Sequence, residues 1–153
     1  MTDRAAVDTM PTRDNARRLA ERWLDEYRVL LCAGDSAGIS KLFAPEGVCV
    51  PSPLDAPIVG RDAIEAFYSA VLADVEVLDL AWDAPLVDAG FASAEWWGTL
   101  RENGKDVSEP GSLHFRLDES GLCLSWRAYP LVGERLQPVP DGWPREIGRT
   151  DRA

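Results

Sequence analysis

The sequence has a single histidine, His114, and only three cysteines, Cys32, Cys49 and Cys123. The cysteines are odd in number and widely spaced, with no CxxC pair, which argues against a disulfide framework and against a zinc site. With one histidine and no clustered ligands, we expect no metal centre. Histidine is the side chain most readily used for proton transfer near neutral pH, so the face of the fold that His114 occupies decides its role.

Long apolar runs and basic residues are also scarce. No apolar run approaches the ~20 residues that cross a bilayer, and the N-terminus has no stretch of signal-peptide type, so we expect a cytoplasmic protein without a membrane partner. Residues 35–128 carry six Lys and Arg against sixteen Asp and Glu, and they hold the whole excess behind the net charge of −10. Such a surface repels phosphate backbones, so nucleic-acid binding is not expected.

The chain has 153 residues, of which 46% are hydrophobic, and this suits one globular domain. We expect a flexible arm over 1–11, the domain over 12–132 and a loosely packed, proline-rich tail over 133–153. Within the domain, apolar residues at helical spacing predict a long helix over 14–33, ended by Gly34.

Two further helices and a set of strands follow in the predicted order. Asp35 can cap a short helix that runs to about Phe43, and Asp62 with Glu65 forms a capping box for a third helix. Alternating patterns and glycine-containing turns then predict a short strand at 48–50 and longer ones near 75–88, 91–102, 111–118 and 122–130. Helices followed by an antiparallel meander predict an α+β fold, with one curved sheet wrapped around a helical layer.

Three segments in this order, "AGDSAGISKLFAPEG", "GRDAIEAFY" and "GLCLSWRAY", resemble the nuclear transport factor 2-like superfamily. Its members include ketosteroid isomerase, limonene epoxide hydrolase and the SnoaL-like polyketide cyclases, and the likeness covers roughly residues 14–132. The resemblance implies a cone-shaped, cystatin-like α+β barrel. Its concave face would hold a small apolar ligand, and its convex face would form a homodimer.

The resemblance also assigns faces to the last two strands. The pocket-facing catalytic acid of ketosteroid isomerase falls at Leu113, so strand alternation turns Leu113 and Phe115 inward and His114 outward. His114 is therefore not expected to be catalytic. By the same alternation, the residues that face inward on neighbouring strands are Trp96, Leu124, Trp126 and Ala128, while Cys123 faces outward.

The catalytic carboxylates of the named relatives are largely absent, because Pro51 and Leu113 occupy two of their positions. Tyr27, however, matches the oxyanion-hole tyrosine of the isomerase, and Tyr68 matches a second tyrosine that bonds to it. A phenol supported by another phenol in an apolar cone is a good donor to a carbonyl, epoxide or enolate oxygen. The alternative is that both tyrosines only pack in the core.

Several other residues are candidates for the site. Trp82, Trp96 and Trp126 would supply flat apolar walls, or would simply fill the core. Cys49 is a possible weak acid–base group. Asp55 and Asp83 are the nearest carboxylates that could serve as a base, although solvated surface acids are the usual case.

The leading hypothesis is a cofactor-independent cyclase or isomerase that acts on an apolar secondary metabolite, polyketide- or terpenoid-like. Tyr27 would donate to the substrate oxygen, and the walls would fold the substrate toward its reactive conformer. A non-catalytic domain for small-molecule binding or dimerisation is the alternative. An adaptor that uses its acidic surface to bind basic segments is a third possibility.

Overall fold

The helices lie at the start of the chain and the strands mostly follow them. The computed structural model describes residues 12–143. Its elements in order are α1 (Arg13–Ala33), α2 (Ser36–Lys41), β1 (Phe43–Val50), β2 (Ile58–Val59), α3 (Arg61–Asp74), β3 (Val75–Trp82), β4 (Leu86–Asp88), β5 (Phe91–Glu102), β6 (Lys105–Leu117) and β7 (Cys123–Pro130). The expected α+β class is confirmed.

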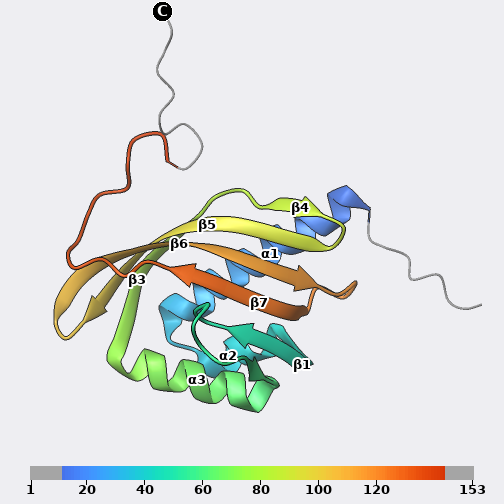
Figure 1. Ribbon diagram of the computed structural model, residues 1–153, viewed down its shortest axis with the longest axis horizontal. Helices are drawn as coiled ribbons and strands as arrows, with labels where there is room; N and C mark the ends of the chain where they lie inside the picture. The colour runs from blue at the N-terminus through green and yellow to red at the C-terminus, as the bar shows by residue number, and fades with distance from the viewer. Residues whose placement is uncertain (1–11, 144–153) are drawn as a thin grey trace, which may run out of the picture.

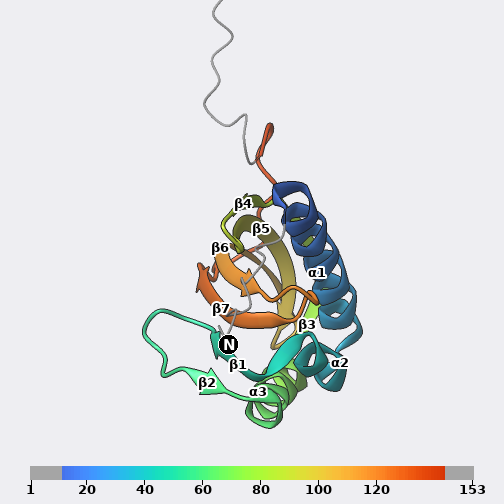
Figure 2. The same ribbon diagram turned by 90° about the vertical axis from the view of Figure 1, so that its right-hand side faces the viewer.

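The strands form one mixed sheet in the order β2-β1-β7-β6-β5-β3, with β4 paired to β5. All neighbouring pairs are antiparallel except β1 and β7, which run parallel, so the sheet is not the purely antiparallel one expected. In Figure 1 the long strands β5, β6 and β7 lie over α1, with α3 below them. Figure 2 shows the sheet curling around α1, with α3 at its lower end.

The predicted ends of α1 are nearly correct. Gly34 follows the helix with φ of 69°, in the left-handed region, and its N–H donates to the carbonyls of Leu30 and Leu31. Glycine adopts that conformation without steric cost, which is why this helix ends here. No helix in residues 12–143 is long and apolar enough to span a membrane.

The predicted start of α3 is wrong. The helix begins at Arg61 after Gly60, which has φ of 88°, and no side chain caps its first turn. Asp62 therefore lies inside the first turn instead of before it, and the expected capping box with Glu65 does not form. The Arg61 side chain instead donates from Nε to the carbonyl of Phe43, 2.8 Å away, and ties the helix start to β1.

The strand predicted over 75–88 is interrupted. It splits into β3 and β4, with Asp83, Ala84 and Pro85 between them. Proline has no N–H to donate to a ladder and fixes φ, so it breaks a strand unless it lies at an edge or a bulge.

The third long strand is longer than predicted, since β6 begins at Lys105 and not at 111. Pro110 lies within it and pairs with Trp97 on β5. Its carbonyl accepts from the N–H of Leu131, on the side away from β5. The nitrogen of Pro110 points to the same side, toward the segment that follows β7, so the ladder loses no bond to β5.

The chain after β7 returns along β6 and binds to Ser108. The N–H of Ser108 donates to Arg135, and its carbonyl accepts from Gly133. Its hydroxyl donates to the carbonyl of Gln137 and accepts from the N–H of Gln137, at 2.9 and 2.8 Å. Residues 133–137 are therefore bound to the sheet and are not the loose tail that the prolines predicted.

Alternation sets the two faces of β6 and β7 as expected, with one exception. Leu113, Phe115, Trp126 and Ala128 are buried, and His114 is exposed. Cys123 is fully buried and Leu124 only half-buried, the reverse of the prediction. The register shifts between Arg116 and Leu117, opposite Cys123, and this irregularity reverses the faces at the start of β7.

Candidate functional site

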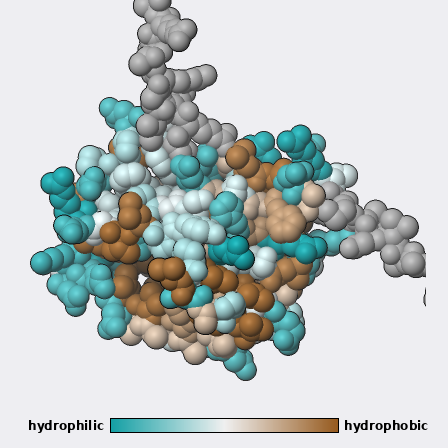
Figure 3. Space-filling model, viewed as in Figure 1, coloured by the Kyte–Doolittle hydropathy of each residue, from teal (hydrophilic) through white to brown (hydrophobic). Residues whose placement is uncertain are grey.

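A cavity of about 190 Å³ lies between α3, α1 and the inner face of the sheet. Its polar groups are few, and its walls combine aromatic with aliphatic side chains. The aromatic residues that line it are Tyr27, Phe67, Tyr68, Trp82, Trp96 and Trp126. The cavity reaches the molecular surface at Val71 on α3, which is 38% exposed. In Figure 3, hydrophobic side chains gather on the face of the molecule over α3.

Two tyrosines from different helices meet at the cavity wall. The hydroxyls of Tyr27 on α1 and Tyr68 on α3 are 2.8 Å apart and hydrogen-bonded, which confirms the contact expected from the resemblance. Burial raises the pKa of both phenols well above their ordinary value. Both therefore stay protonated at neutral pH, and the pair can offer a proton in a hydrogen bond to a ligand.

Cys49 stands behind this pair and does not line the cavity. It is fully buried on β1, and its thiol is hydrogen-bonded to Tyr68. Burial raises the pKa of the Cys49 thiol to about 12, although the bond from Tyr68 opposes the rise. The thiol is therefore protonated at neutral pH and is not a nucleophile. It supports Tyr68 from the far side.

Glu109 on β6 is the only carboxyl group among the residues in the described chain that line the cavity. Burial raises the pKa of the Glu109 carboxyl group to about 7. The hydrogen bond from the Trp96 indole opposes this rise, whereas the negative charge of Glu102 adds to the rise. A carboxyl group that titrates near neutral pH can both accept and return a proton. The charge of Glu109 also raises the pKa of Tyr27, so the two groups interact across the cavity.

Two glycines make room for Glu109 and its partner. Gly111 lies opposite Trp96 in the ladder, and a Cβ at Gly111 would come within 2.3 Å of the Trp96 ring. The ring therefore lies over the bare backbone of Gly111 and reaches Glu109, two residues along on the same face. Gly98 lies opposite Glu109, and a Cβ there would come within 3.2 Å of the Glu109 backbone oxygen, a tighter approach than side chains usually make.

Sequence reasoning missed Glu109, although a signal for it was present. The predicted strand begins at 111, directly after Pro110, and so leaves Glu109 outside it. Counting back in steps of two from the inward-facing Leu113 gives Gly111 and then Glu109. The same alternation that assigned Leu113 would thus have found the carboxyl group, had the strand been extended through the proline.

The carboxylates expected to supply a base lie outside the cavity. Asp55 is exposed in the loop between β1 and β2. Asp83 follows Trp82, and since Trp82 lines the cavity, alternation turns Asp83 to the other side. The Asp83 carboxylate accepts from the N–H of Ala84 at 2.6 Å. Neither residue is placed to act on a molecule in the cavity.

Two other expected lining residues belong to the filled part of the core. Leu113 and Phe115 are buried and do not reach the cavity. The Phe115 ring stacks on Trp23 at 5.3 Å, which closes that end of the sheet. The expected walls Trp82, Trp96, Trp126 and Ala128 do line the cavity.

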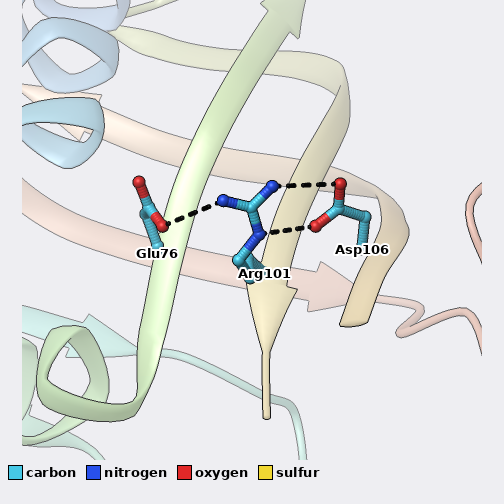
Figure 4. A network of polar contacts seen from close by, with 3 residues as sticks. All are labelled: Glu76, Arg101 and Asp106. Carbon is cyan, nitrogen blue, oxygen red and sulfur yellow. Dashed lines mark hydrogen bonds and ion pairs between the residues drawn. The ribbon is translucent and has the colours of Figure 1, made fainter. Parts of the chain in front are cut away.

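The outer face of the sheet carries a different set of contacts near the cavity. Arg101 on β5 binds Glu76 on β3 and Asp106 on β6, with its Nε 2.8 Å from the Asp106 carboxylate (Figure 4). These pairs hold three strands together on the side away from Glu109. His114 is also on the outer face, where its ring packs edge-on against Tyr129. The homodimer expected through this face stays a prediction.

Within residues 12–143, no group of three or more His, Cys, Asp and Glu side chains is arranged to hold a metal ion. A comparison with curated protein sequences found no significant match. A comparison with protein-family models matched the SnoaL-like domain over residues 20–126, which is more than half of the chain. This range contains both tyrosines, Glu109 and all three cavity tryptophans. The chain belongs to the SnoaL-like domain family of the nuclear transport factor 2-like superfamily.

Proposed function

We propose that the protein is a cofactor-independent enzyme of cyclase or isomerase type that acts on a compact apolar metabolite, polyketide- or terpenoid-like. The observation that carries this proposal is that a protonated phenol and a carboxyl group of near-neutral pKa line one apolar cavity. Cyclases and isomerases occur in the family, which is consistent with this chemistry. The family alone does not fix an activity, so the proposal depends on these two groups.

In an enolisation, Tyr27 would act on the carbonyl oxygen and Glu109 on the neighbouring C–H bond. Tyr27 donates a hydrogen bond to a carbonyl oxygen of the substrate. The ionised Glu109 removes a proton from the neighbouring carbon, and the electron pair of that C–H bond forms the enolate, whose charge rests on the oxygen at Tyr27. Donors placed in advance at a developing oxyanion are often the largest catalytic contribution.

The second half of the reaction returns the proton. In an isomerisation, Glu109 gives it to a different carbon of the enolate. In a cyclisation, the enolate carbon bonds to a second carbonyl carbon, and the alkoxide that forms takes the proton from Glu109. Atoms and electrons balance in both cases without an oxidant or a co-reactant.

Deuterium exchange tests this mechanism without knowledge of the natural substrate. We would incubate the protein in D₂O with compact ketones, such as 3-cyclohexenone and tetralone, and follow exchange at the carbon next to the carbonyl by NMR. We expect catalysed exchange that falls as the pH drops below about 7. Tyr27→Phe should slow it by about 10²–10³-fold, and Glu109→Gln by at least about 10²-fold.

Glu119→Gln is the matched control, since Glu119 is exposed in the turn between β6 and β7 and does not line the cavity. It should keep most of the exchange activity. If exchange survives in a folded Glu109→Gln variant, Glu109 is not the base. If no ketone exchanges, the result favours the alternative of a non-catalytic binding domain. The absence of carboxylates at positions 51 and 113, where the chain has Pro51 and Leu113, is also in line with that alternative.

A further inference from the structure

The charge character of the cavity points to a class of ligand. Six aromatic rings, the Glu109 carboxyl group and ten aliphatic or proline residues line it, while none of its lining residues within 12–143 is Arg, Lys or His. The face of an aromatic ring is electrostatically negative and attracts cations. Apart from the neutral hydroxyl and indole donors of the tyrosines and tryptophans, the polarised groups in the walls favour positive charge.

The rings stand as walls and do not stack on one another. Tyr27 meets Trp82 at 6.2 Å and 47°, and Trp126 at 6.0 Å and 55°. Trp82 meets Trp96 at 5.9 Å and 62°. In the filled part of the core, by contrast, Tyr27 stacks on Trp23 at an angle of only 17°, where each ring covers the face of the other. The cavity rings therefore do not cover one another's faces.

Positive side chains near the cavity are turned away or neutralised. Arg101 is on the strand next to Glu109, but its guanidinium is bound to Glu76 and Asp106 on the outer face (Figure 4). Arg28 on α1 is paired with Asp79 on β3. The segment 35–128, which supplies most of the cavity, has ten more acidic than basic residues, sixteen against six. The surrounding field therefore also attracts cations.

We propose that the cavity binds a compact apolar molecule that carries an alkylated ammonium group, enclosed by Trp82, Trp96 and Trp126 with its charge toward Glu109. This inference rests on the proposed function in taking the cavity as the ligand site, and it adds the class of ligand. A cavity of about 150 Å³ holds benzene, so about 190 Å³ suits an ammonium head group with a few more carbons. Aromatic cages with a nearby carboxylate are well suited to such groups.

Binding should be linked to the ionisation of Glu109. The titratable groups that interact with Glu109 are Glu102 on β5 and Tyr27 on α1, and neither is positive. An ammonium group would stabilise the ionised carboxylate and lower its pKa. Below pH 7, cation binding should therefore release a proton, whereas a neutral ligand should release none.

Choline and 3,3-dimethyl-1-butanol test the proposal, because they have nearly the same shape and differ in charge. We would titrate the protein with each at pH 8.0 and pH 5.5, using calorimetry in two buffers of different ionisation enthalpy. At pH 8.0 we expect choline to bind about ten-fold or more tightly than the alcohol, with the ratio falling at pH 5.5. The proton release should appear at the lower pH with choline only.

Variants separate the charge effect from changes in packing. Glu109→Gln should weaken choline binding at pH 8.0 by about ten-fold and leave the alcohol within two-fold, while Glu119→Gln, in the exposed turn between β6 and β7, should change neither appreciably. Equal or tighter binding of the alcohol would overturn the proposal, as would no binding of either probe at millimolar concentrations. The ketone exchange experiment is independent, so cation binding without exchange would refute the enzyme and not the ligand class.

Discussion

The inner face of the sheet is filled at one end and hollow at the other, although both ends are built from aromatic residues. At the filled end, Trp23 packs on Phe43 and Phe115, and its indole N–H donates to the carbonyl of Leu42 at 3.1 Å. At the hollow end, the buried indole N–H groups of Trp82 and Trp126 have no hydrogen-bond partner among the described residues.

This difference separates a core from a candidate site. A buried N–H without a partner costs roughly 1–3 kcal/mol, so the hollow end needs a hydrogen-bond acceptor, such as water or a ligand, for these two indoles. It also holds the carboxyl group whose pKa burial raises to about 7, which is a further cost to the folded state at neutral pH. Both ends contain aromatic residues, so aromatic content does not distinguish them. They differ in whether the buried indole N–H groups have hydrogen-bond partners, and in the glycines that lie opposite Trp96 and Glu109.

Removing one aromatic ring from each end should give the largest difference in the free energy of unfolding. Phe115→Ala opens a void in the filled end and should lower the free energy of unfolding by about 3–5 kcal/mol. Phe67→Ala removes the same ring from the cavity wall, where Phe67 is only half-buried, and should cost about 1–2 kcal/mol. Urea denaturation followed by circular dichroism measures both. Equal losses would show that the two ends are packed alike.

The pH dependence of the free energy of unfolding should reveal the titration of Glu109 in the hollow end. Its pKa in the folded protein, about 7, is above the ordinary value of 4.5. The protonated Glu109 carboxyl group therefore makes its full contribution to the free energy of unfolding below pH 4.5. That contribution is lost as the pH rises through 7. The shift corresponds to a loss of up to about 3 kcal/mol.

Glu109→Gln should remove this component and make stability between pH 5 and pH 8 flatter than in the wild type. Urea midpoints at several pH values measure it, with Glu119→Gln, an exposed residue of the turn between β6 and β7, as the control that keeps the wild-type profile. An unchanged profile in Glu109→Gln would mean that the carboxyl group is well solvated in the folded protein.

The smallest effect is expected on the outer face. His114→Ala should change the free energy of unfolding by less than about 0.5 kcal/mol, since the side chain is exposed and its described ring contact is the edge-on one to Tyr129. Ketone exchange should be unchanged as well. A large loss of exchange in a folded variant would return the histidine to the list of catalytic candidates and contradict the assignment of faces.

Much of the fold follows from local patterns in the sequence. The periodicity of α1 and the glycine after it predict that helix well, because helix faces and left-handed caps leave direct traces in the sequence. The start of α3 was misplaced, because Gly60 and the bond from Arg61 to β1 replace the side-chain cap that Asp62 suggested. Tertiary contacts of this kind are not visible in local spacing.

The candidate site was predictable in part. The tyrosine pair came from the resemblance, and the tryptophan walls came from that likeness together with strand alternation. Glu109 was missed because the predicted strand begins after Pro110. A proline within a strand is tolerated only where its missing N–H removes no bond of the ladder, and the local sequence does not show where that is. Asp55 and Asp83 were close along the chain to cavity residues, but the loop and the alternation of the strand place them elsewhere.

The attachment of residues 133–137 to Ser108 changes where the domain ends. The last strand stops at Pro130, and a protein cut there would keep every helix and strand of the described chain. It would nevertheless lose the partners of a buried serine that immediately precedes Glu109. The border of the domain therefore lies beyond the end of its last strand, and a truncated or fused version should retain residues through at least Gln137 to keep Ser108 and Glu109 in position.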